Sequence, residues 1–193
     1  CLHTEFSPLP GLTFRESLYN GVASDRINRQ FRFCPRSDGM FNIGSLSYHI
    51  GEEDRHHGYY AVGYALGSSP SETSADKTFN YALWTLIEQP LLHVGESHLG
   101  AMWQGGTSPA SRSTCRHYWG AGLIWSNIPP QMTQVGLVVN RALYADGRET
   151  DVELTGSFPV CNHFTLQPAV HCINTNGNYT AAAQLRAILE FGN

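Results

Sequence analysis

The chain has 193 residues, enough for one sizeable domain, and its 12 Lys and Arg against 16 Asp and Glu give a formal net charge of −4. This mildly acidic balance argues against a nucleic-acid partner, which normally needs a basic surface. No apolar run reaches the roughly 18 residues of a membrane-spanning helix, and 41% hydrophobic residues exclude a disordered chain. Charged residues make up only 15%, and 19 Gly accompany 11% aromatic residues, which favours a β-rich domain.

The sequence opens at Cys1 in an alternating stretch, without an initiator Met or a basic segment followed by an apolar one. Two interpretations of Cys1 stay open. It is either the lipidated cysteine of a bacterial lipoprotein or the residue at a reading-frame or fragment boundary.

Alternation of apolar and polar residues is the dominant pattern and predicts strands. In the last segment, Ala183, Leu185 and Leu189 share one face, whereas Gln184 and Arg186 lie on the other. Most predicted strands have about 9 to 11 residues, the length that a tilted strand needs to cross a bilayer. The strands are expected over residues 2–6, 12–20, 40–50, 58–66, 80–89, 95–104, 117–126, 132–142, 149–159, 163–172 and 181–191.

Two architectures fit this alternation: a soluble sandwich that buries its apolar faces, and a membrane barrel that turns them to lipid. The predicted connections alternate between short and long along the chain. The short ones are residues 7–11, 51–57, 90–94, 127–131 and 160–162, and the long ones are 20–39, 67–79, 105–116, 143–148 and 173–179. Outer-membrane barrels sort their loops in this way. The sequence therefore predicts an all-β fold, an antiparallel transmembrane β-barrel of about ten or eleven strands, as a single domain over residues 1–193.

Several segments carry a family likeness. The stretch ETDVELTGSFPVCNHFTLQPAVHCINTNGN from Glu149, followed by AAAQLRAILEF, resembles the C-terminal strands of OprB-type carbohydrate-selective porins. SLYNG, DGMFNIGSLSY, EQPL, GAGLIWSNIPP and VGLVVNRA resemble further segments of that family in the same order.

The resemblance implies a bacterial outer-membrane porin through which small carbohydrates such as glucose diffuse passively, without catalysis or a cofactor. The implied partners are these sugars, the lipid bilayer and lipopolysaccharide, and homo-oligomers are left open. The family barrel has 16 strands, so the chain resembles its C-terminal portion. Two positions depart from the family pattern: Gly192 and Asn193 follow the terminal aromatic Phe191, and Ser45 stands where the family tends to carry an acidic residue.

A sugar pore needs polar groups that exchange hydroxyl hydrogen bonds and aromatic rings on which sugar faces slide. For each candidate the alternative is a wall residue that only solvates the interior, and Arg186 could form a structural ion pair with Glu153 or Glu190. The pore-lining candidates are Arg15, Trp84, Glu88, Asp151, Glu153, Gln167, His171, Gln184, Arg186 and Glu190.

Six aromatic residues suit a girdle at the lipid interface, with a soluble core as the alternative: Tyr60, Tyr64, Trp103, Tyr118, Trp119 and Trp125. No metal site is predicted, because His56-His57 sits in a turn and the chain has no CxxC or HxxxH spacing.

The cysteines are judged from the predicted topology. Cys34 and Cys115 fall in connections on the same side and could form a disulfide, whereas Cys161 and Cys172 lie at opposite ends of one strand and cannot.

Rival functions come from other classes. An enzyme is disfavoured because Ser97 and His98 are strand neighbours that face opposite sides, and because no GxSxG elbow occurs. A soluble or surface sugar-binding β-domain without channel activity explains the aromatics but not the alternating loops. An inactive porin fragment also stays open. With too few strands, a barrel must close at a smaller diameter, pair with a missing piece or fail to insert.

Overall fold

The structure, a computed structural model, describes residues 1–21, 35–51, 58–70, 77–129 and 132–190. Within this part of the chain there are eleven strands and one short helix, and no helix is both long and apolar enough to span a membrane. The elements are β1 (Leu2–Leu9), β2 (Leu12–Asn20), α1 (Pro35–Asp38), β3 (Met40–Ile50), β4 (Gly58–Pro70), β5 (Lys77–Val94), β6 (Ser97–Thr107), β7 (Cys115–Ile128), β8 (Met132–Tyr144), β9 (Arg148–Cys161), β10 (Phe164–Thr175) and β11 (Asn178–Leu189).

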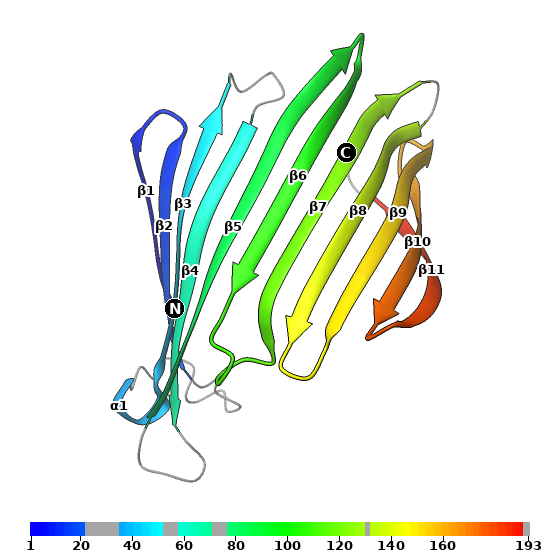
Figure 1. Ribbon diagram of the computed structural model, residues 1–193. Helices are drawn as coiled ribbons and strands as arrows, with labels where there is room; N and C mark the ends of the chain where they lie inside the picture. The colour runs from blue at the N-terminus through cyan, green and yellow to red at the C-terminus, as the bar shows by residue number, and fades with distance from the viewer. Residues whose placement is uncertain (22–34, 52–57, 71–76, 130–131, 191–193) are drawn as a thin grey trace.

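Every strand pairs antiparallel with the next one in the sequence, so the strands form a single sheet in the order β1 to β11 (Figure 1). The all-β antiparallel fold and the strand number are therefore confirmed. The sheet curves like the wall of a barrel, and β1 and β11 lie at its two edges (Figure 1).

The sheet is not closed. Across the described residues, β1 pairs with β2 and β11 with β10, and the two edge strands do not meet. The narrow barrel of ten or eleven strands that the sequence allowed is not what forms. Strand number, tilt and diameter are linked in a barrel, and the curvature of this sheet is too gentle to bring its edges together.

Most strands run beyond their predicted ends. The clearest case is β5, which continues through Pro90 to Val94, where the sequence predicted a turn. Proline cannot donate a ladder hydrogen bond, but the pairing register with β6 shifts between Pro90 and Leu92. This irregularity accommodates the proline without ending the strand.

The β10–β11 connection shows why some predicted loops shrink. Asn176 and Gly177 both have positive φ angles, 54° and 96°, and Thr175 pairs directly with Asn178 across them. Asn-Gly is the sequence typical of a two-residue hairpin with positive φ at both positions. The predicted 173–179 connection is therefore a tight turn.

Connection lengths follow the predicted alternation only in part, because the β3–β4 connection, predicted short, spans residues 51–57, and the β4–β5 connection, predicted long, spans only 71–76. The β2–β3 connection contains α1 and the β6–β7 connection spans residues 108–114, whereas β1–β2 and β5–β6 turn within residues 10–11 and 95–96. The β8–β9 turn, at 145–147, is short, although the sequence predicted a longer connection there.

The two faces of the sheet differ in chemistry. On one face, here called the apolar face, large side chains such as Leu46, Val62, Leu137 and Leu185 are exposed, with exposed fractions of 45%, 56%, 48% and 67%. The opposite face, the polar face, carries side chains such as Arg15 and Asp151. Only Ala61 and Ala169 are buried hydrophobic residues in the described part of the chain.

A soluble sandwich would bury its apolar faces between two sheets. The residues that the structure describes form a single sheet with no second layer, so the sandwich architecture is wrong. An exposed apolar surface of this extent requires lipid or protein against it.

Candidate functional site

Nine of the ten predicted pore-lining residues lie on the polar face. Directly paired residues of antiparallel strands share a face. One such row runs across four strands, from Arg15 to Ser45, Gly63 and Trp84. The register and alternation of their own strands give the same facing to Glu88, Asp151, Glu153, Gln167, His171, Gln184 and Arg186. Glu190 follows the end of β11 and is exposed. Whether a sugar contacts them stays a prediction.

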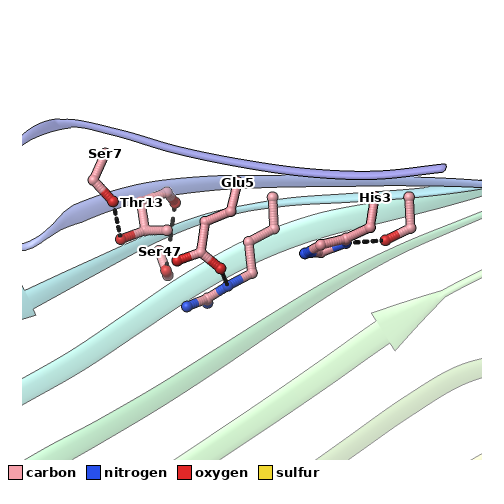
Figure 2. Close-up of polar contacts among 7 residues, drawn as sticks. His3, Glu5, Ser7, Thr13 and Ser47 are labelled. Carbon is pink, nitrogen blue, oxygen red and sulfur yellow. Dashed lines mark hydrogen bonds and ion pairs between the residues drawn. The ribbon is translucent and has the colours of Figure 1, made fainter.

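A cluster of polar contacts lies along β1 to β3 and includes His3, Glu5, Ser7, Thr13 and Ser47 (Figure 2). The Arg15 Nε donates a hydrogen bond to Oε2 of Glu5 at 2.8 Å, as an ion pair. His3 Nδ1 lies 2.7 Å from the Ser17 hydroxyl on the same pair of strands (Figure 2). Ser45, opposite Arg15, is the position where the family resemblance expected an acid. Glu5 therefore supplies the carboxylate for Arg15 from the other neighbouring strand.

Trp84 lies at the other end of the same row. Its indole covers Gly63, where an added Cβ would come within 2.3 Å of the ring. Ser45 and Gly63 are small, so no large side chain stands on the sheet surface between the Arg15–Glu5 pair and the Trp84 ring. This surface, with a charged pair on one side and an aromatic ring on the other, could contact a sugar face and its hydroxyls.

A second polar network, on β6 to β8, was missed by the sequence prediction. Gln104 Nε2 lies 2.6 Å from the Tyr118 hydroxyl, which donates to Asn140 Oδ1 at 2.7 Å. Gln104 and Asn140 both stand directly opposite Gly120, whose lack of a side chain lets them approach each other. Gly120 follows Trp119, which was predicted to face lipid, so alternation places Gly120 on the polar face, and this small residue was the sequence signal for the network.

Tyr118 was predicted in the aromatic girdle, and this is wrong, because its hydroxyl belongs to the polar-face network. The girdle prediction ignored that neighbouring residues on a strand face opposite sides. The other five aromatics do lie on the apolar face, and Trp103 and Trp119 stack there with ring centroids 6.0 Å apart.

A third polar group joins Asp151, Glu153 and His171 on β9 and β10. Glu153 pairs directly with His171, and His171 Nδ1 lies 3.1 Å from Asp151 Oδ2. One nitrogen or oxygen of each of the three side chains lies within 4.8 Å of the others. The sequence named all three residues but did not predict that they meet as a cluster.

Arg186 does not form the ion pair that was considered for it. It stands opposite Gln167, whereas Glu153 stands opposite His171, four residues further along β10. In the described part of the chain Arg186 makes no ion pair with Glu153 or with Glu190. At a strand rise of about 3.3 Å per residue, the side chains of Arg186 and Glu153 are too far apart.

One polar cluster lies on the apolar face. Glu16 is flanked along β2 by Phe14 and Leu18, and both of its carboxylate oxygens accept hydrogen bonds from the Tyr64 hydroxyl, at 3.0 and 2.9 Å. The Asn42 amide donates to the same carboxylate. Because its partners share the face, this carboxylate is satisfied without water.

The cysteine and histidine predictions have mixed outcomes. Cys161 and Cys172 are both free, as expected. Cys115 is also free, which does not support the predicted Cys34–Cys115 disulfide. Cys34 and His56-His57 lie outside the described residues, so that disulfide stays a prediction.

Comparison with known proteins shows a likeness of fold. A solved structure of OprB from Pseudomonas putida, determined at high pH, superposes with a TM-score of 0.74 at 12% sequence identity. The alignment covers 96% of this chain and 56% of that one, so the chain spans a little over half the length of OprB. No family model and no curated protein sequence matches the chain.

The likeness confirms the predicted resemblance to part of an OprB-type protein at the level of the fold. It also accounts for the gentle curvature of the sheet. A wall that corresponds to part of a larger barrel has the radius of the whole barrel, and that radius rises with strand number.

Proposed function

We propose that this chain forms the wall of an outer-membrane porin through which small carbohydrates, such as glucose, diffuse passively. The observation that carries the proposal is the chemical division of one curved antiparallel sheet. Its exposed apolar face suits lipid and its polar face suits a water-filled lumen. The likeness to OprB supports the same geometry.

The polar face supplies the chemistry that selective diffusion needs. The Arg15–Glu5 pair and the Trp84 ring face the lumen from one end of the sheet, and the cluster of Asp151, Glu153 and His171 faces it from the other. Such groups exchange hydrogen bonds with sugar hydroxyls while binding stays weak enough for release. This function involves no covalent step.

A second candidate is a porin-like sheet that inserts into the membrane but does not conduct by itself. The open edges of β1 and β11 favour it. In lipid, each unsatisfied backbone group at an open edge costs several kcal/mol, so a conducting state needs these edges to be paired.

The deciding experiment is single-channel recording of the refolded chain in a planar bilayer, with glucose added as a blocker. Discrete current steps that glucose partly closes are the expected result. Folded, bilayer-inserted protein that gives no steps would support the non-conducting sheet. Protein that stays in aqueous buffer without detergent would contradict both candidates.

A further inference from the structure

We propose that Asp151, Glu153 and His171 form a binding site for a divalent transition-metal ion such as Zn²⁺ on the polar face. The three side chains come from the adjacent strands β9 and β10, and their ligand atoms lie within 4.8 Å of one another. An imidazole nitrogen with two carboxylate oxygens is a donor set that zinc accepts. The proposed function places the same three side chains in the lumen, but binding of a metal ion to them goes beyond that function and does not require transport.

The negative charges of the cluster favour the binding of a cation. Two carboxylates lie close together, and in the described part of the chain neither forms an ion pair with Lys or Arg. Their nearest neighbours across the ladder are Asn140, Val138 and Ile173, none of which carries a charge. His171 lies against them at 3.1 Å from Asp151, and the neutral Tyr118 hydroxyl on β7 also interacts electrostatically with Asp151. A bound divalent ion would offset the mutual repulsion of the carboxylates.

A second, independent observation concerns Asp151 Oδ1. This oxygen is inaccessible to solvent and accepts no hydrogen bond within the described residues. Leaving a buried carboxylate oxygen without a donor is energetically costly. A metal ion held between the three side chains would coordinate the carboxylate and remove this cost.

The geometry leaves room for an ion and for water. Zinc bonds to nitrogen and oxygen are about 2.0 to 2.2 Å, which places tetrahedral ligands about 3.4 Å apart. Side chains that are now within 4.8 Å reach this spacing by small rotations. The side chains of His171 and Asp151 are about one-fifth exposed, at 20% and 21%, so water can complete the coordination sphere.

The donor set also separates classes of ion. Ca²⁺ and Mg²⁺ prefer all-oxygen sites, whereas an imidazole ligand favours Zn²⁺, Ni²⁺ and Cu²⁺. The site should therefore bind Zn²⁺ or its spectroscopic substitute Co²⁺, and should not bind Ca²⁺.

The test is calorimetric titration of the refolded chain in detergent with ZnCl₂, with CaCl₂ as the comparison and Co²⁺ absorption as the spectroscopic readout. We expect saturable binding of about one Zn²⁺ per chain and a Co²⁺ spectrum typical of nitrogen and oxygen ligands. His171→Ala and Asp151→Asn should each weaken binding at least about tenfold. His163→Ala, in the exposed β9–β10 turn, is the matched control and should leave it unchanged.

A gain-of-ligand variant keeps the test decisive if the loss variants fold poorly. Ala182 on β11 stands directly opposite His171, so Ala182→His places a fourth ligand beside the site. This variant should bind Zn²⁺ at least about tenfold more tightly. Absence of saturable Zn²⁺ binding, or equal binding by wild type and His171→Ala, would overturn the proposal. So would an Ala182→His variant that gains nothing.

Discussion

The indole of Trp84 lies over Gly63 on β4, with β3 between it and the Arg15–Glu5 ion pair. At the scale of single residues, this combination of a ring, a charged pair and two small residues is the polar-face feature best suited to a sugar. Trp125 lies on the opposite, apolar face. Substitutions of Trp84 and Trp125 therefore compare the polar and the apolar face with the same residue type.

We expect Trp84→Leu to weaken glucose binding by about fivefold, equivalent to about 1 kcal/mol, because the ring face available for stacking is lost. Trp125→Leu should leave glucose binding unchanged. Glucose-dependent current block, or intrinsic fluorescence titration in detergent, measures both variants. Equal effects of the two substitutions would show that stacking on Trp84 is not part of recognition.

Tyr64 matters at the residue scale for stability. Its hydroxyl donates to both oxygens of Glu16 on the apolar face, where water is not available to replace it if this face meets lipid. Tyr64→Phe should lower the free energy of unfolding in detergent by about 1 to 3 kcal/mol. The measurement is a denaturant titration followed by fluorescence.

Tyr48 is the control for this prediction. It lies on the same face, on the neighbouring strand β3, and is 45% exposed. Tyr48→Phe should change the denaturation midpoint little. A Tyr64→Phe variant as stable as Tyr48→Phe would mean that the Glu16 carboxylate does not depend on that hydroxyl.

At the scale of one element, β11 carries neighbouring residues that face the two sides of the sheet. Leu185 points to the apolar face and Gln184 to the polar face, opposite Pro168 and Ala169 of β10. Leu185 is also one of the most exposed large apolar residues of the described chain, at 67%. A charge placed at either position therefore tests what each face contacts.

Leu185→Arg should destabilise the membrane-inserted state by about 2 to 4 kcal/mol, because the guanidinium would enter lipid. Gln184→Arg should be tolerated, because it adds the same charge to the water-facing side. The fraction of protein that refolds into lipid vesicles reports the difference. Equal insertion of both variants would contradict a lipid-facing apolar surface.

At the scale of the whole molecule, the facing of the sheet predicts a pattern of chemical labelling. Cys172 pairs with Val152 and Ala181 on the apolar face, and Gln167 lies on the polar face of the same strand. In lipid vesicles, a water-soluble maleimide should label Gln167→Cys and spare Cys172, each tested as a single-cysteine variant. After solubilisation in denaturant both should react. Rapid labelling of Cys172 in vesicles would place that face in water.

The sequence determined the strands and their faces. Period-two alternation is a local property, so it placed Leu185 and Arg186 on opposite sides without knowledge of neighbouring strands. It also brought nine of the ten candidate residues to one face. It failed at local exceptions, such as Pro90, because the compensating register shift belongs to the pairing with β6.

Only the tertiary structure decided which of these residues meet. Contact across strands depends on register, and register places Glu153 beside His171 but leaves Arg186 beside Gln167. The same holds for Glu5, which reaches Arg15 in place of an acid at position 45. Closure is likewise a property of the whole sheet: curvature accumulates over all the strands, and here it leaves β1 and β11 apart.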